Sequence, residues 1–228
     1  MMTMRPVERG DQPIDESGKP IRFTKYQEAS PYLKERLGRY CSYCEMHLPA
    51  GLHIEHIQPK SHYPQQKLDW NNFLLACVHC NSAKGDTDII AREYYLPDQD
   101  NTFRAFKYTA DGSIIPHPKL TPPQQRLALK SLELFNLSQN TCSENDPRLL
   151  QRREAWEIAK EAYADLQNGA TIRTVKRLAQ AKGFWSVWIT VFQDNPEMLN
   201  LFIQDFPGTC QQCFDQSGKP VPRPSGAL

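Results

Sequence analysis

The chain has 228 residues, of which 39% are hydrophobic, and 27 Lys and Arg residues nearly balance 26 Asp and Glu residues, giving a formal net charge of +1. This balance excludes a globally basic nucleic-acid-binding protein but leaves local basic patches open. No apolar run approaches the roughly 20 residues that span a bilayer, and positions 1–10 lack the apolar core of a signal peptide, so we expect a cytoplasmic protein without a membrane partner.

Residues 1–38 form a predicted N-terminal arm that has little hydrophobic periodicity. Basic residues gather between this arm and the first cysteine pair, namely Arg22, Lys25, Lys34, Arg36 and Arg39. A second basic cluster lies further along the chain and contains Arg173, Lys176, Arg177 and Lys182. Such clusters either bind a phosphate backbone or form the solvated face of a helix; both roles stay open, and the second cluster favours the solvated face.

Four of the seven cysteines form two C-x-x-C pairs that are separated by 32 residues: Cys41, Cys44, Cys77 and Cys80. Two residues between thiolates let one tight turn aim both sulfurs at a single ion, so the two pairs predict a tetrahedral zinc site rather than four reduced thiols. A site with four cysteines has no open position, so this zinc is expected to be structural. For Cys142, Cys210 and Cys213 we favour ordinary reduced thiols over a second metal site that would include His117.

The segment between the cysteine pairs supplies groups suited to catalysis. Residues 52–57 alternate as in a strand, a second apolar strand is predicted over 73–77, and a short helical turn ends at Gly85. Glu55 and His56 on the first strand, with Asn72 and Asn81 on later elements, are expected to converge beside the cysteines. Oxygen donors suit Mg²⁺, and a neutral imidazole suits proton abstraction.

The rest of the chain predicts a hairpin followed by helices. Residues 103–108 alternate, Asp111-Gly112 is a turn, and a partner strand is expected over 113–115. Beyond residue 118, Thr121 and Gln124 form a capping box, Asp146 begins a second helix, and Gly169 and Gly183 separate further helices. The apolar run 184–192 is interpreted as a buried core helix, with a partner-docking surface as the alternative.

The central segment resembles the HNH endonuclease family of the zinc-knuckle type. The resemblance covers Cys41-x-x-Cys44, Glu55-His56-Ile57-x-Pro59-x-Ser61, Asn72 and Cys77-x-x-Cys80-Asn81-x-x-Lys84-Gly85, about 45 residues. It implies the ββα-metal fold, with His56 as the general base, Glu55 and Asn81 as ligands of a catalytic Mg²⁺ or Mn²⁺, and Asn72 holding the loop that orients His56. Glu55 replaces the more usual Asp, and Asn81 stands in place of the final His.

The overall layout resembles the HNH subunit of Septu anti-phage systems, and similar proteins accompany some retrons. The resemblance rests on the start Arg-Pro-Val-Glu-Arg-Gly, the central zinc-knuckle module, the hairpin and the helical tail. It implies a PtuA-like ABC-type ATPase as partner. This chain has no G-x-x-x-x-G-K-[ST] loop, so any ATP-dependent control is expected to come from that partner. DNA is the favoured substrate and RNA the other. Retron components are a further candidate partner.

The expected fold class is therefore α+β: an arm over 1–38, an HNH nuclease module with its hairpin over 39–118, and a helical region over 119–228 that docks a partner. Lys84 is either a phosphate contact or a solvated lysine, and His53 is a metal ligand, a substrate contact or a surface imidazole. The alternative function is a zinc-stabilised adaptor that binds nucleic acid or a partner without cutting.

Overall fold

The computed structural model describes residues 4–228 as a mixed α/β fold with two small antiparallel sheets. In the first sheet β1 (His53–His56) pairs with β2 (Phe73–Ala76), with His53 opposite Ala76 and His56 opposite Phe73. Helix α2 (Val78–Lys84) follows directly. In the second sheet β3 (Phe106–Tyr108) pairs with β4 (Ile114–Pro116). The predicted ββα unit, hairpin and α+β class are confirmed.

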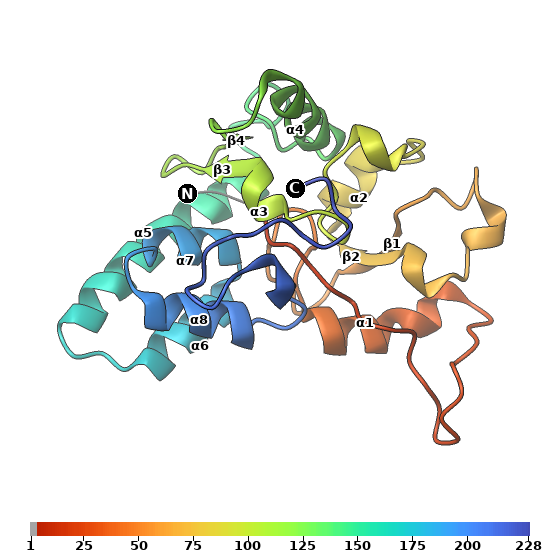
Figure 1. The fold of residues 1–228 in the computed structure, drawn as a ribbon, viewed down its shortest axis with the longest axis horizontal. Coiled ribbons are helices and arrows are strands. Elements are labelled where there is room, and N and C mark those ends of the chain that lie inside the picture. The colour runs from red at the N-terminus through yellow and green to blue at the C-terminus, as the bar shows by residue number, and fades with distance from the viewer. Residues whose placement is uncertain (1–3) are drawn as a thin grey trace.

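Helices surround these two sheets (Figure 1). Helix α1 (Ser30–Leu37) lies beside β1 and β2, and α3 (Thr102–Ala105) and α4 (Pro122–Leu134) lie near the second sheet. The C-terminal helices gather on the opposite side of the molecule from α1: α5 (Pro147–Gln167), α6 (Ile172–Lys182), α7 (Trp185–Val191) and α8 (Pro196–Asp205). Within residues 4–228, no helix combines the length and apolar character needed to cross a membrane.

Helix starts follow the predicted capping chemistry. The Gln124 side chain accepts a hydrogen bond from the Thr121 backbone N–H at 2.9 Å, and the Asp146 carboxylate accepts one from the N–H of Arg148 at 2.8 Å. The expectation of a strand over 103–108 is wrong for its first half. The Asn101 side chain accepts from the N–H of Phe103 at 3.1 Å, and this cap starts α3 where alternation alone suggested a strand.

The core contains α7, which connects the C-terminal helices to the hairpin. Trp185 and Trp188 are each at most 1% exposed, and both indole N–H groups donate to backbone carbonyls, those of Phe202 and Gly183. Because burying a tryptophan requires a partner for its N–H, these contacts fit a core position. The interpretation of 184–192 as a buried helix is therefore confirmed, and the docking-surface alternative is not.

The N-terminal arm is tied into this core by buried polar groups. The Arg5 guanidinium donates to the carbonyls of Pro207 at 2.6 Å and Leu37 at 3.2 Å, and Val7 pairs with Thr209 in an antiparallel bridge. Buried charged groups persist only when they are satisfied in this way. The arm therefore packs between α1 and the segment after α8. The division into regions 1–38, 39–118 and 119–228 stays a prediction.

A four-cysteine cluster beside a candidate catalytic cleft

Cys41, Cys44, Cys77 and Cys80 converge as the sequence predicted. Their sulfur atoms lie within 4.8 Å of one another, and all four side chains are buried. Cys44 Sγ and Cys77 Sγ are 3.7 Å apart. A tetrahedral zinc with bonds of about 2.3 Å requires sulfur–sulfur distances of about 3.8 Å, so the cluster has the dimensions of a closed four-thiolate site.

The surroundings of the cluster shift the pKa of three of its thiols. Burial raises the pKa of the Cys44 and Cys80 thiols, whereas hydrogen bonds from Cys41 and the other two cysteines lower the pKa of Cys77. Without a cation, these contacts hold protons on the most buried sulfurs. Thiols bind a metal only after losing those protons, so an ion in this cluster would displace them.

Two buried side chains connect the cluster to distant parts of the chain. Arg148 on α5 donates from Nη1 to Cys80 Sγ at 3.3 Å and is anchored by Asp146 and the carbonyls of Phe135 and Asn136. Its positive charge offsets part of the −2 that four thiolates and a divalent ion would carry. Glu45, directly after the first cysteine pair, accepts hydrogen bonds from Arg5 and Ser186.

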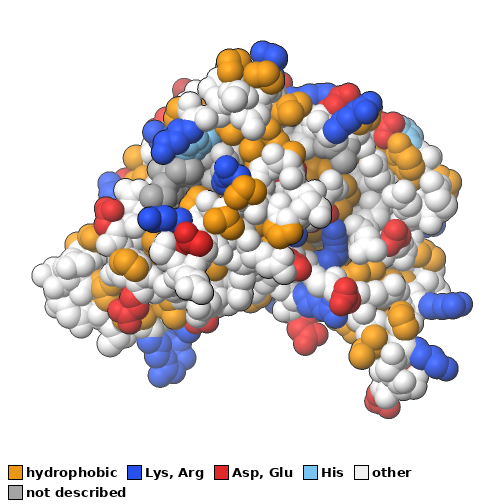
Figure 2. All heavy atoms as spheres, viewed as in Figure 1, with side chains coloured by type: hydrophobic (Ala, Val, Ile, Leu, Met, Phe, Trp, Pro, Cys, Tyr) orange, Lys and Arg blue, Asp and Glu red, His pale blue; other side chains and the backbone are white. Residues whose placement is uncertain are grey.

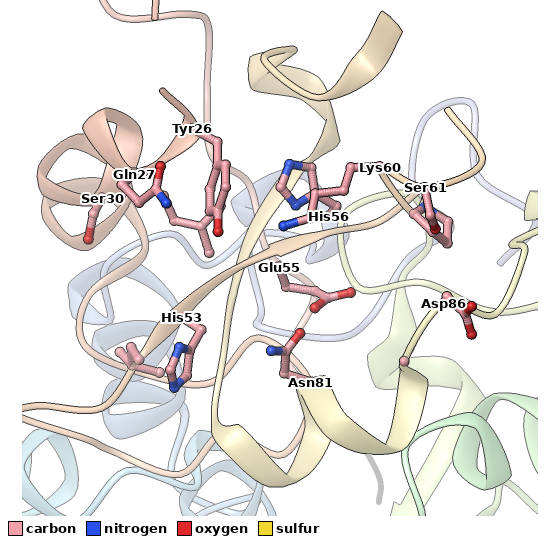
Figure 3. Close-up of a pocket in the computed structure, with 14 residues that line it drawn as sticks. Tyr26, Gln27, Ser30, His53, Glu55, His56, Lys60, Ser61, Asn81 and Asp86 are labelled. Carbon is pink, nitrogen blue, oxygen red and sulfur yellow. The ribbon is translucent and has the colours of Figure 1, made fainter. Parts of the chain in front are cut away.

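A cleft of about 520 Å³ is lined by residues of β1 and by Asn81, which directly follows Cys80 of the cluster (Figure 3). His53, Glu55 and His56 reach it from β1 and the strand end, and Asn81 reaches it from α2. The opposite wall comes from the arm and carries Tyr26, Gln27 and Ser30. Three of the four residues expected to act catalytically, Glu55, His56 and Asn81, therefore line one cavity.

Glu55 is held by Lys84. The Lys84 Nζ lies 2.8 Å from Glu55 Oε1 and donates to the backbone carbonyl of His56 at 2.9 Å. The two side chains are only 2% and 4% exposed, and Lys84 does not line the cleft. Burial raises the pKa of Glu55, and the Lys84 charge opposes that rise. Lys84 is thus neither a solvated lysine nor placed against substrate, and it orients the Glu55 carboxylate.

We expect Lys84→Met to destabilise the protein by about 3–5 kcal/mol, because it leaves the buried Glu55 carboxylate without its counter-charge. Adding Glu55→Gln should recover most of that loss. The measurement is urea unfolding of the zinc-loaded protein in buffer without Mg²⁺. Lys160→Met is the matched control, since Lys160 is 52% exposed in its pair with Glu157. Equal effects of the two lysine substitutions would contradict a stabilising role for the buried pair.

His56 is enclosed by two aromatic rings. The Tyr26 ring packs against the imidazole at a centroid distance of 4.9 Å and the Phe73 ring at 5.2 Å, both edge-on. His56 Nε2 lies 3.0 Å from the carbonyl oxygen of Lys67. A carbonyl only accepts, so Nε2 carries the proton and the neutral ring keeps a free lone pair on Nδ1. Burial lowers the pKa of His56 and favours this neutral form.

Asn72 holds the loop that follows β1. Its Oδ1 accepts from the N–H of Gln58 at 2.7 Å, and its Nδ2 donates to the carbonyls of Gln58 at 2.9 Å and Gln66 at 3.2 Å. The Asn72 carbonyl also accepts from the N–H of Ile57. This loop carries Lys67, whose carbonyl meets His56, so Asn72 acts on His56 through the backbone.

Asn81 and His53 complete the oxygen and nitrogen donors that face Glu55. Strand alternation places His53 and Glu55 on one face of β1, and Figure 3 shows both near the Asn81 side chain. The Glu55 carboxylate and the Asn81 amide supply oxygen donors of the kind that suit Mg²⁺ or Mn²⁺. His53 is exposed, so its three expected roles stay open.

Sequence reasoning missed the contribution of the arm. Tyr26 contacts His56, and the Lys60 Nζ lies 4.6 Å above the Tyr26 ring centroid. Tyr26 lies 30 residues before His56, and no motif connects the two. Within residues 4–228, the four clustered cysteines are the one group of three or more His, Cys, Asp or Glu side chains placed to hold a metal. Cys142, Cys210 and Cys213 do not form a second such group.

Two comparisons with known proteins agree with this geometry. Residues 41–87 match the family model for HNH endonucleases, a segment that holds the cysteine cluster and β1–β2–α2. The chain is also 33% identical over 92 residues to the Septu protein PtuB of Bacillus thuringiensis. That alignment covers 36% of this chain and 36% of PtuB, so the chain matches about a third of the length of this curated relative.

Proposed function

We propose that this chain is a divalent-metal-dependent HNH endonuclease that hydrolyses phosphodiester bonds of nucleic acid, with DNA as the favoured substrate and RNA as the other. It serves as the effector nuclease of an anti-phage defence complex in the cytoplasm. A PtuA-like ABC-type ATPase controls it, and retron components are a further candidate partner. A structural zinc occupies the four-cysteine cluster.

One observation carries this proposal. Glu55, His56 and Asn81 line a single cleft next to four clustered cysteines, inside the segment that matches the HNH endonuclease family. An adaptor that only bound a partner would have no need for a buried carboxylate, a neutral imidazole and an amide at the same cavity. The similarity to PtuB supports the defence role and the ATPase partner.

The geometry supports a role for each of these residues in the proposed reaction. Nε2 of His56 is engaged by the Lys67 carbonyl, so Nδ1 takes the proton from the water that attacks phosphorus. Glu55 and Asn81 would hold Mg²⁺ or Mn²⁺, with Lys84 keeping the Glu55 carboxylate in place. Such an ion, when bound, offsets the negative charge that develops on the phosphoryl and leaving oxygens. Asn72 fixes the loop behind His56.

Cleavage assays test the proposal directly. Supercoiled plasmid, single-stranded DNA and RNA are incubated with the zinc-loaded protein and Mg²⁺ or Mn²⁺, alone and with a PtuA-like ATPase. We expect nicking that requires the added ion and stops when Mg²⁺ or Mn²⁺ is omitted. No cleavage of any substrate in any combination would overturn the enzymatic proposal and favour the adaptor.

We expect the cleavage rate to fall only at acidic pH, with the midpoint of the fall in kcat/KM below pH 6.5. Burial lowers the pKa of His56, so the imidazole stays neutral down to that lower pKa and the base is lost only beneath it. The measurement is kcat/KM between about pH 4.5 and about pH 8.5 at saturating Mg²⁺. Zinc content is followed at each pH, because protons also compete for the thiolates. A midpoint above 6.5 would contradict this environment for His56.

A further inference from the structure

We propose that segment 26–39, at the end of the arm, is a substrate-binding surface. It binds the nucleic-acid backbone where that backbone leaves the cleft, with Lys34 and Arg39 contacting phosphates. The inference rests on the proposed function, and it adds a second binding surface outside the segment that matches the HNH family. The inference requires three properties of this surface. It must be continuous with the cleft, carry basic side chains that are not paired within the protein, and have a fixed position relative to His56.

The cleft continues along α1. Ser30 lines both the catalytic cleft and a neighbouring hollow of about 480 Å³, whose other lining residues are Pro31, Lys34, Glu35 and Arg39. Gln27, Ser30 and Lys34 follow one another at spacings of three and four residues, which places them on one helical face. A strand leaving the cleft past Ser30 therefore meets Lys34 next.

Lys34 and Arg39 have positively charged N–H groups that are available to bind phosphate. No hydrogen bond or ion pair holds the Lys34 ammonium in the described structure, and Arg39 donates from Nη1 to the carbonyl of Pro49 at 2.8 Å, with its other N–H groups uncommitted. Arg36, by contrast, is spent inside the protein: it donates to the carbonyls of Arg9 and Asp11 and lies over the Trp70 ring. Glu35 is the one acidic residue that lines this hollow.

Two lysines of the second basic cluster are already paired with acidic side chains. Figure 2 shows acidic and basic side chains interspersed on the face in view, as a net charge of +1 leads one to expect. In the second basic cluster, Lys176 pairs with Asp205, and Lys182 pairs with Glu154. Arg173 and Arg177 remain exposed, on α6, away from the cleft.

The segment is fixed against the catalytic residue at one end. Tyr26 packs on the His56 imidazole and lies under the Lys60 ammonium. The start of this surface therefore has a fixed position relative to the proposed general base. A backbone bound along α1 would thus place its next phosphate in the cleft. Contacts of this kind position a substrate without reading its sequence.

Binding measurements test this surface independently of cleavage. The zinc-loaded full chain carrying His56→Ala is titrated against fluorescein-labelled single-stranded DNA, duplex DNA and RNA at several salt concentrations. Lys34→Gln and Lys34→Gln/Arg39→Gln are compared with Arg173→Gln/Arg177→Gln, which removes two exposed arginines elsewhere. Glu35→Gln is the variant of opposite sign. Lys34→Gln removes no hydrogen bond or ion pair within the described structure. A change in its binding therefore reports on the lost charge rather than on a damaged fold.

We expect each lost phosphate contact to weaken binding of every probe and to reduce the slope of log K against log salt by about one. Glu35→Gln should tighten binding, and the α6 double variant should change neither quantity. Unchanged affinity and slope in Lys34→Gln/Arg39→Gln, an equal loss in the α6 variant, or no binding of any probe would overturn the inference. Loss of binding with no cleavage by the wild-type chain would leave this surface standing and reject the nuclease.

Discussion

Replacing Cys77 with Ser is expected to release the zinc and unfold the β1–β2–α2 unit. Cys77 supplies one of the four clustered sulfurs and also begins α2, since its sulfur accepts from the N–H of Cys80. Structural zinc contributes about 10–16 kcal/mol of apparent binding free energy in small zinc domains. That is comparable to the net stability of about 5–15 kcal/mol of typical proteins, so loss of the zinc is expected to unfold this unit.

The measurements are zinc per chain by elemental analysis and unfolding by circular dichroism in urea. Cys142→Ser is the matched control, because Cys142 is half-buried and stands outside the cluster. It should keep its zinc and change the free energy of unfolding by less than about 1 kcal/mol. Equal behaviour of the two variants, or a full zinc content in Cys77→Ser, would show that the cluster is not a structural metal site.

The parts of the site that sequence predicted are those encoded within short segments. Spacing of two between cysteines, alternation over β1 and the position of Gly85 each reflect backbone geometry that a few neighbouring residues determine. Gly85 has a φ of +54°, which glycine adopts readily and which ends α2. Glu55, His56 and Asn81 therefore met in one cleft as expected, while their catalytic roles stay predictions.

Contacts between distant segments escaped prediction because no local pattern encodes them. Arg148 reaches Cys80 across 68 residues, and Glu45 meets Ser186 across 141. Both roles expected for Lys84, a phosphate contact and a solvated lysine, place it at the surface, where lysine is usually found. Lys84 is buried because β1 and α2 place the Glu55 carboxylate next to its ammonium group. The arm has little hydrophobic periodicity to predict its position, yet Tyr26, Gln27 and Ser30 form a wall of the cleft.

Distant contacts connect the four-cysteine cluster to elements beyond α2. Arg148 joins it to the first turns of α5, and Glu45 joins its first turn to the arm and α7. Contacts therefore run from α5 and α7, in the region 119–228 that is expected to dock a partner, to the cysteine pairs, and Asn81 directly follows the second pair.

Replacing His56 with Ala is expected to lower the cleavage rate by about 10²–10⁴-fold, the range supplied by a positioned general base. At about 1.36 kcal/mol for each factor of ten, the barrier rises by about 3–5 kcal/mol. Zinc should stay bound, because the cysteine ligands are untouched. The substitution removes a ring packed between Tyr26 and Phe73, so a stability loss of about 1–2 kcal/mol is expected.

Single-turnover cleavage, zinc content and urea unfolding measured together separate these effects. His62→Ala is the matched control, since His62 is exposed and does not line the cleft, and it should retain the wild-type rate. His56→Gln fills more of the space and tests whether a rate loss follows the missing base rather than loosened packing. If His56→Ala cut as fast as the wild-type chain, Nδ1 of His56 could not be the base. A rate loss accompanied by zinc loss would instead make His56 a structural residue.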